Sequence, residues 1–575
     1  MLTLVIVSIL ITWLLCAAVC IGVGSLLLRA FHFSFSPLDA LWTGLALIVA
    51  FLQVHHFLRP IDSLAVFLLA ALALIGLLWN RTLLLQQFNL QTFQPANILL
   101  FLLAAIIIAF RAAGPCEHYD TGLYGAQAIR WFSTYPLVPG LGNLLGQLGF
   151  NSSIFLFIAA LDKGPWRGLA HHLFSGFLIA ALFASILPAA LRVFRATNVS
   201  SIDWFYALLF VPAAILGATG QIAGANTDLP TTVVCLAAAA MLFRALDVVT
   251  DEPDANEKRC MNLLIAMLLF CLAVTFKISS IVFAFSGWIL ACFQLWPLSR
   301  RSLSRKSYIA IAVIFSAAIV VPWICRGLIL SGYPFFPSTA LGISFEWQAP
   351  AADAQLQADF ARSFARIPEL SFDAAWGWEW LRPWFRGLVR EREGFLIPLV
   401  FALAGCGVGI IQMAREKKNV LPQWLWLLAP SLAGLVFWFV EAPAIRFGEP
   451  IFWTVAATLG TLAALQLCGQ PIKKRLFILV LLLLTAWAAH PRLLWCSYFR
   501  PSISVRTFLR LPEARVVPHR TSSGLTVYVP VETNQCWDAP LPCSSHFSDA
   551  LRLRGPANMR SGFASKGPVA DERSR

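Results

Sequence analysis

Long apolar stretches separated by polar segments run along almost the whole chain. A stretch of about 17 to 25 apolar residues is long enough to form a helix that crosses a hydrocarbon layer about 30 Å thick. Lys277 divides one long apolar block into two such stretches. Fourteen spans are predicted, at 3–28, 38–57, 63–79, 97–113, 168–191, 204–220, 227–247, 261–275, 278–296, 307–330, 395–413, 424–440, 450–468 and 476–490.

This pattern divides the chain into two parts. Residues 1–490 are predicted to form an all-α polytopic membrane domain, a helical bundle of about 14 spans, and residues 491–575 a small C-terminal region. Two loops of the membrane domain, 114–167 and 331–394, are long and rich in Trp, Tyr and Phe. We therefore expect both loops to fold against the membrane surface. The apolar stretch 154–161 is too short to cross a bilayer and is interpreted as an interfacial helix.

Composition agrees with a membrane protein. The chain is 59% hydrophobic and 13% charged, whereas soluble domains contain roughly 25% charged residues. Its net charge of +14 would suggest nucleic acid in a soluble protein, but in a membrane protein basic residues report on orientation. No nucleic-acid partner is expected. Most of the 13 cysteines lie in apolar runs, where Cys acts as a small hydrophobic residue.

The distribution of Lys and Arg predicts which loops face which side. Short cytoplasmic loops are enriched in these residues. One alternating assignment places 16 Lys and Arg residues in seven inside loops and three in four short outside loops. It puts both termini, the two long loops and the C-terminal region on the outer face.

The C-terminal region is predicted to be a small independent unit. Residues typical of β-strands are concentrated at 525–531, and two closely spaced cysteines follow, Cys536 and Cys543. An oxidising extracytoplasmic compartment would allow these cysteines to pair, although the sequence alone leaves the disulfide open.

The segment 116–124 gathers more polar chemistry than a simple loop requires. Glu117 and Asp120 are candidate catalytic residues, because a carboxylate at the membrane surface can act as general base for an acceptor hydroxyl. Two nearby carboxylates can also hold a divalent cation, Mg²⁺ or Mn²⁺, that neutralises a leaving phosphate. The alternative is that Asp120 caps a helix running from Gly125 to Phe132.

Four further residues of the first long loop are candidates for substrate binding. His118 and Tyr124 lie beside the two carboxylates. Asn143 and Asn151 can bind sugar hydroxyls, but Asn next to Gly is also typical of turns. Both interpretations stay open.

Three charged residues from distant parts of the sequence are predicted to meet on the outer face. Asp228 opens the seventh span, Lys277 lies at the turn between the eighth and ninth, and Arg446 precedes the thirteenth. Charges at the membrane edge usually line a cavity or pair with one another. Asp228 is therefore a candidate catalytic residue that assists in positioning, and the two cations are candidates for binding a lipid phosphate. Alternatively, Lys277 snorkels and Arg446 pairs with a neighbouring glutamate, Glu441 or Glu449.

The loop 331–394 interleaves aromatic and basic residues. Trp and Tyr favour the headgroup level of a membrane, and Arg can reach phosphates there. Anchoring at the interface explains this composition, and seating a lipid-linked sugar is the alternative. The residues concerned are Tyr333, Trp347, Trp376, Trp378, Trp380, Trp384, Arg382, Arg386 and Arg390.

Several of these motifs resemble known families. The acidic first outer loop, the Thr-Asp-Leu-Pro opening of a later span and the basic residue at a further outer turn resemble the GT-C superfamily of glycosyltransferases, mainly over residues 97–330. Over nearly the whole chain the sequence resembles an uncharacterised bacterial family of polytopic membrane proteins that has no assigned reaction. The motifs of this second resemblance are Asp120-Thr-Gly-Leu-Tyr124, Val138-Pro-Gly-Leu-Gly-Asn143, Phe150-Asn-Ser-Ser153, Gly332-Tyr-Pro-Phe-Phe-Pro-Ser338 and Gln535-Cys-Trp-Asp-Ala-Pro-Leu-Pro-Cys543.

The GT-C resemblance implies a function. It implies transfer of a sugar from a polyprenyl-phosphate donor to a glycan or lipid acceptor, on the outer face of a bacterial inner membrane, in cell-envelope glycan synthesis. The first-loop carboxylate, here Asp120 or Glu117, would be the base or a metal ligand. The sequence departs from the GT-C pattern in two ways. Three apparent spans precede the helix that leads into this loop, and the acidic residues are spaced as Glu-His-Tyr-Asp.

Other functions remain open. A polymerase or ligase of surface polysaccharide also uses outer-face arginines and needs no carboxylate base in the first loop. A transporter favours charged residues or broken helices near the middle of spans, and a scaffold protein would tolerate the loss of Asp120. The sequence indicates neither the sugar, the acceptor nor the oligomeric state.

Overall fold

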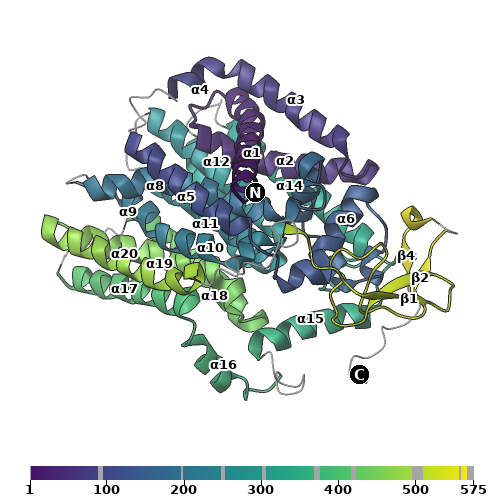
Figure 1. The fold of residues 1–575 in the computed structure, drawn as a ribbon. Coiled ribbons are helices and arrows are strands. Elements are labelled where there is room, and N and C mark those ends of the chain that lie inside the picture. Colours follow the sequence, from purple (N-terminus) through teal and green to yellow (C-terminus); the bar gives the residue numbers. More distant parts are fainter. Residues whose placement is uncertain are drawn as a thin grey trace.

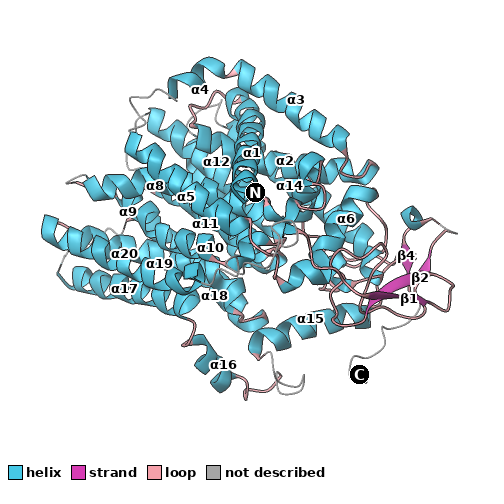
Figure 2. Cartoon of the chain, viewed as in Figure 1, coloured by secondary structure: helices cyan, strands magenta, loops and turns pink. Residues whose placement is uncertain are grey.

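The structure is a bundle of helices with a small strand-containing region at one side (Figure 1; Figure 2). It is a computed structural model that describes residues 2–87, 95–195, 198–247, 253–300, 306–367, 376–415, 422–494, 509–555 and 558–565. The first half contributes α1 (Leu2–Ala30), α2 (Pro37–Leu58), α3 (Ser63–Trp79), α4 (Arg81–Gln87), α5 (Pro95–Ala112), α6 (Ala126–Thr134), α7 (Ile154–Leu161), α8 (Phe174–Arg195), α9 (Ser201–Leu208), α10 (Phe210–Ala218), α11 (Asp228–Leu246) and α12 (Pro253–Phe276). The second half contributes α13 (Ile281–Arg300), α14 (Lys306–Ser331), α15 (Ala351–Arg366), α16 (Leu381–Leu388), α17 (Ile397–Arg415), α18 (Leu428–Glu441), α19 (Ile445–Leu467) and α20 (Pro471–Leu494).

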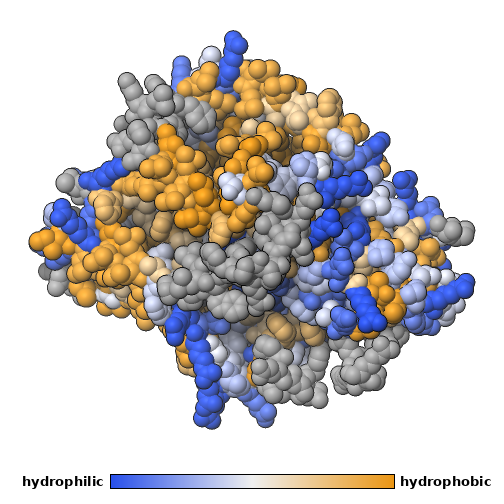
Figure 3. All heavy atoms as spheres, in the orientation of Figure 1, coloured by the Kyte–Doolittle hydropathy of each residue, from blue (hydrophilic) through white to orange (hydrophobic). Residues whose placement is uncertain are grey.

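The described part of the chain contains eleven helical segments that are long and apolar enough to cross a membrane. Two shorter apolar helices, Ser63–Trp79 and Asn97–Ala112, accompany them. Apolar side chains cover the molecular surface over α1, α3 and α5, whereas hydrophilic residues gather around α6 and the C-terminal strands (Figure 3). The protein is therefore a multi-pass α-helical membrane protein, while the count of 14 spans stays a prediction.

The predicted sidedness is not tested by the fold. Four of the basic residues on which it depends, Arg301, Arg305, Lys417 and Lys418, lie outside the described residues.

The first helices pack through glycines. A Cβ atom on Gly24 of α1 would lie 1.9 Å from the carbonyl oxygen of Ala40 in α2, and one on Gly22 would lie 2.3 Å from that of Ala73 in α3. Small residues let helix backbones approach this closely in a membrane, where packing replaces the hydrophobic effect as the force between helices. The glycines therefore set the contacts of α1 with α2 and α3.

The two most enclosed spans are α11 and α12. In the apolar windows of these helices, 94% and 89% of the residues are buried inside the protein. Neither helix faces lipid over most of its length, so polar residues at their ends are surrounded by protein. Asp228 begins α11, and Lys277 directly follows α12. The predicted break of the apolar block at Lys277 is confirmed.

The short stretch 154–161 forms α7, but this helix does not lie at an interface. Every residue from Ile154 to Ala159 is buried. An interfacial helix needs a polar face, and these six residues are apolar on all sides. The preceding serines tie α7 to the end of α12, because Ser152 Oγ donates to the carbonyl of Phe276 and Ser153 Oγ bonds Thr275 Oγ1 at 2.8 Å.

The C-terminal region contains two short antiparallel pairs. Strands β1 (Val516–Arg520) and β2 (Thr526–Pro530) form a hairpin, and β3 (Arg552–Leu553) pairs with β4 (Phe563–Ala564). Cys536 and Cys543 form a disulfide, as the sequence predicted.

This region packs against the long loops of the membrane domain. Ser544 Oγ donates to the carbonyl of Leu144, the amide of Phe563 donates to that of Pro139, and Arg552 pairs with Glu346 at 3.0 Å. Isolated two-stranded pairs are marginally stable in water, so we expect these contacts to stabilise the region, while its independence stays a prediction.

Candidate functional site

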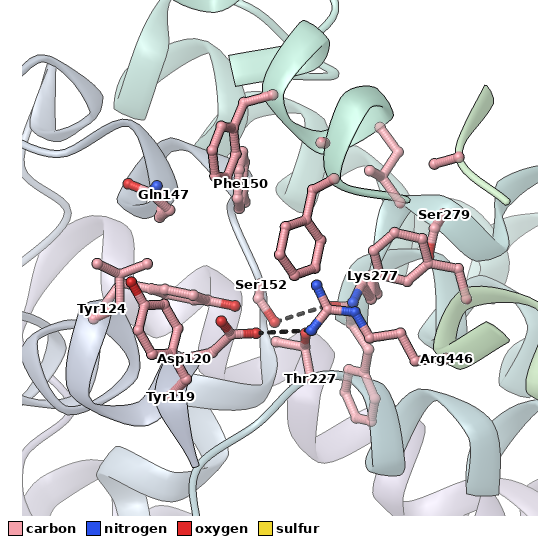
Figure 4. A pocket seen from close by; sticks show the side chains of 18 of the residues that line it. Tyr119, Asp120, Tyr124, Gln147, Phe150, Ser152, Thr227, Lys277, Ser279 and Arg446 are labelled. Carbon is pink, nitrogen blue, oxygen red and sulfur yellow. Dashed lines mark hydrogen bonds and ion pairs between the residues drawn. The ribbon is translucent and has the colours of Figure 1, made fainter. Parts of the chain in front are cut away.

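A cavity of about 1600 Å³ lies where the two long loops meet the ends of the spans. Its walls come from the segment before α6, the turn between α12 and α13, α15, and the facing ends of α18 and α19. Figure 4 shows Asp120, Lys277 and Arg446 directed into this cavity from three distant parts of the sequence. The predicted convergence of Asp228, Lys277 and Arg446 is confirmed, because Asp228 pairs with Lys277 and lies 3.8 Å from Arg446.

Asp120 lies at the start of a wide helical turn, Thr121–Gly125, with π-type hydrogen bonding. Its carboxylate makes no capping hydrogen bond, so the interpretation of Asp120 as a helix cap is wrong. One carboxylate oxygen lies 3.8 Å from Nη1 of Arg446. The turn is attached to the segment that precedes α11, because Thr121 Oγ1 donates to the carbonyl of Ala225 at 3.2 Å. Single π-type turns are frequent at functional sites.

Asp228 and Lys277 form a buried ion pair behind Asp120. The second carboxylate oxygen of Asp228 lies 3.8 Å from Nη1 of Arg446. The Phe447 ring lies beneath both cations, 4.2 Å from Lys277 Nζ and 5.0 Å from the guanidinium carbon of Arg446. Two cations and two carboxylates therefore form one cluster at the edge of the cavity, and Lys277 pairs with Asp228.

The local sequence explains why the Asp228 carboxylate is available to the cations. The side-chain oxygen of Asn226 accepts from the amide of Leu229 at 3.0 Å and so satisfies the N-terminus of α11. A carboxylate in the first turn of a helix is favoured by the helix dipole. The helix dipole therefore stabilises the Asp228 carboxylate, and this carboxylate remains free to pair with Lys277. Glu441, one alternative partner of Arg446, pairs with Arg362 at 2.7 Å instead.

His118, Tyr124 and Glu117 also line the cavity. Burial lowers the pKa of His118, and the nearby Asp120 and Asp228 carboxylates oppose this effect only in part. Its Nδ1 is buried and has no hydrogen-bond partner among the described residues. Burial raises the pKa of Tyr124 well above its usual range, and its hydroxyl bonds the side chain of Thr227. Glu117 is exposed at the rim.

Two of the predicted substrate-binding residues do not reach the cavity. Asn143 donates to the carbonyls of Gly140 and Trp347, which is the turn chemistry its neighbours suggested. Asn151 adopts a left-handed conformation with φ of 56°, donates to the carbonyl of Trp323 and accepts from Arg326. Both side chains are buried and used within the protein.

The described residues do not fit a metal held by protein ligands alone. Among them, no group of three or more His, Cys, Asp and Glu residues could hold an ion. Asp120, the central predicted ligand, faces Arg446 instead. Glu117 and Asp120 as a metal pair therefore stay a prediction, and no step below depends on a metal.

Sequence reasoning missed two features of the structure. Gln147, Phe150 and Gln357 line the cavity, but glutamine and phenylalanine at these positions carry no chemical signature. Arg326 is fully buried in α14, where it bonds His56 Nδ1 at 2.6 Å as well as Asn151. An arginine inside an apolar span is a signal that could have found this second feature.

The fold and the site define a polytopic α-helical membrane protein with a charged cavity at the ends of its spans. The family model described as a domain of unknown function, DUF8201, matches residues 6–453, and the chain belongs to this family. The match includes both long loops and the charged residues Asp120, Asp228, Lys277 and Arg446, and it ends before the C-terminal region. No curated protein matches the chain. No solved structure matches it either.

Proposed function

We propose that this protein is a membrane glycosyltransferase of GT-C type, which transfers a sugar from a polyprenyl-phosphate donor to a glycan or lipid acceptor. The observation that carries the proposal is the placement of Asp120 beside Arg446 and next to the Asp228–Lys277 pair, at the wall of one large cavity. A general base and a phosphate-binding group are the two functions that glycosyl transfer from a lipid phosphate requires.

In the proposed reaction an acceptor hydroxyl attacks the anomeric carbon of the donor sugar. Asp120 takes the hydroxyl proton as the new C–O bond forms. The bond between the sugar and the phosphate breaks, and Arg446 and Lys277 stabilise the departing phosphate. Asp228 holds these two cations in place. The cavity offers them a partly enclosed setting, where such charges act more strongly than in water.

Other residues of the cavity suit the acceptor. Gln147, Phe150 and Gln357 line the cavity and supply two amide groups and an aromatic ring. Amide groups both donate and accept hydrogen bonds, which suits hydroxyl groups. In Figure 4, Asp120 lies between Gln147 and Arg446, as expected of a base between acceptor and donor.

We place the cavity on the outer face of a bacterial inner membrane, as the distribution of Lys and Arg indicates. The disulfide of the C-terminal region supports this placement, because disulfides persist in oxidising compartments. The expected partners are membrane lipid, the lipid-linked sugar and the acceptor, with no nucleic acid.

A surface-polysaccharide polymerase or ligase is the second candidate, since Arg446 and Lys277 would serve a lipid pyrophosphate equally well. A scaffold would tolerate the loss of the Asp120 carboxylate, and a transporter would favour charges near the middle of spans.

The test is Asp120→Asn, compared with Asp549→Asn as a control. Asp549 is a carboxylate of the C-terminal region that does not line the cavity. Since Asp120 makes no cap bond, Asp120→Asn should leave protein abundance normal and reduce the glycan or glycolipid product on the order of 100-fold, the scale of a lost general base. Glycan profiles and immunoblots measure both quantities. Normal product in the Asp120→Asn strain would rule out this mechanism and favour a ligase, transporter or scaffold.

A further inference from the structure

A loop of the C-terminal region lies directly on the turn that carries Asp120. The amide of Trp537 donates to the carbonyl of Gly122 at 3.0 Å, and Gln535 Nε2 donates to that of Tyr119 at 3.0 Å. The Tyr119 hydroxyl in turn donates to Asn534 Oδ1 at 2.7 Å. These bonds join segments more than 400 residues apart in the sequence, on either side of Asp120.

The Trp537 ring occupies the space that a side chain at position 122 would need. A Cβ atom on Gly122 would lie 2.5 Å from the ring carbon Cε2 of Trp537. Gly122 is only two residues from Asp120 and lies inside the π-type turn. The ring therefore packs against the backbone that sets the direction of the catalytic carboxylate.

Two residues of α6 hold this loop in place. Gln127 Nε2 donates to the carbonyls of Trp537 and Ala539. Arg130 donates to the carbonyls of Asp538 and Ala539 and forms an ion pair with the Asp538 carboxylate. The disulfide Cys536–Cys543 closes the loop, which restricts its conformations before it docks.

We propose that Trp537, presented by this disulfide-closed loop, is a positioning residue for Asp120. This inference rests on the proposed function. Trp537 does not line the cavity, so it acts on the reaction only through the turn. The loop lies beyond the part of the chain that the family model matches, and a segment outside the family domain thus completes the site.

The first measurement does not depend on catalysis. Cys116 is buried beside the turn, where burial raises the pKa of its thiol to about 11 and its side chain bonds Thr121. Its thiol is therefore protonated and shielded. If Trp537 holds the turn, Trp537→Ala should increase labelling of Cys116 by N-ethylmaleimide in native membranes at least about threefold, consistent with more frequent local opening. Peptide mass spectrometry measures the labelling of Cys116 in the variant against the unsubstituted protein.

The second measurement is the turnover of the transfer reaction. Trp537→Ala should lower turnover at least about tenfold without changing protein abundance or the donor KM, because a displaced base slows the chemical step. Trp537→Phe retains an aromatic ring and should restore most of the turnover. Gly122→Ala should also lower turnover, and Gly122→Ala combined with Trp537→Ala should cost less than the product of the two single effects, because removing the ring frees space for the new methyl group.

The matched control is Glu346→Gln. It removes the ion pairs of Arg552 and Arg554, which attach the same C-terminal region through a residue that does not line the cavity. It should change neither labelling nor turnover. Unchanged Cys116 labelling and turnover in Trp537→Ala would overturn the inference, as would an equal response to Glu346→Gln. Raised labelling together with normal product in both Trp537→Ala and Asp120→Asn would support the docking but reject the proposed function.

Discussion

Lys277 and Asp228 form an ion pair at the back of the cavity, although 49 residues separate them in the sequence. The pair joins the start of α11 to the end of α12, and the two helices pack side by side. Arg446 approaches the same carboxylate from α19. One carboxylate thus orients two cations that the proposed reaction needs.

The first prediction concerns the stability of this cluster. Breaking a buried ion pair by removing one partner costs about 3–5 kcal/mol. Asp228→Asn should be the more damaging change, because it leaves Lys277 without its carboxylate partner and leaves two cations with Asp120 alone. Lys277→Gln should cost less, since Asp228 keeps Arg446 at 3.8 Å. Thermal unfolding of the purified variants in detergent measures the difference. Equal destabilisation by both changes would contradict the shared arrangement.

The second prediction concerns pH. Because the pKa of His118 in the folded protein is below its usual value, the unfolded chain binds a proton on this residue before the folded protein does. Stability should therefore fall as the pH drops below about 6.5, the ordinary pKa of histidine. His118→Gln should weaken this dependence, while the other histidines contribute equally to both proteins. Melting temperatures of the two proteins between about pH 7.5 and 5.5 provide the comparison; parallel curves would refute a buried neutral His118.

The third prediction concerns helix packing. Gly24→Val should lower the amount of folded protein in the membrane, because the new side chain would meet the α2 backbone at Ala40. Overpacking of this kind costs about 1–3 kcal/mol or more. Gly407→Val in α17 is the control, since no atom lies within 4 Å of a Cβ there. Detergent-extracted protein, separated by size-exclusion chromatography, gives the folded fraction of each. Similar yields of both variants would disprove the role of the α1–α2 contact.

The fourth prediction concerns sidedness. Reporter fusions after residues 120, 360 and 520 should report the outside, and fusions after 303, 417 and 474 the cytoplasm, because Lys and Arg are concentrated in the latter loops. A cytoplasmic signal from the fusion at 120 would make an outer-face transferase untenable.

Much of the fold was predictable from the sequence. A helix in lipid must satisfy its own backbone hydrogen bonds and present apolar side chains, so the spans appear directly as apolar runs. Lys277 marked a real turn between α12 and α13. A charged residue costs little free energy at the end of a membrane helix and much more in its middle. The cluster of Asp120, Lys277 and Arg446 was predictable for a related reason. Exposing a charged side chain to lipid costs much free energy. Charged residues at the ends of spans therefore pair with one another or line a shared cavity.

The C-terminal region was predicted less well. The spacing of Cys536 and Cys543 made a disulfide possible in an oxidising compartment, and the structure contains it. The docking of this region on the turn of Asp120 was not predicted. Trp537 and Gly122 lie far apart in the sequence. No sequence pattern around either residue indicates that the two are in contact.

The sequence by itself determined which segments are membrane helices and which charged residues lie at their ends, because both follow from the free energy of placing each residue in lipid or water. Only the tertiary structure decided which side chains of the long loops reach the cavity. Asp120 and Asn151 lie in the same long loop, yet one faces the cavity and the other bonds Trp323 and Arg326 inside the protein. The direction of each side chain depends on the close packing of residues distant in sequence, where a shift of a few tenths of an ångström changes which contacts can form.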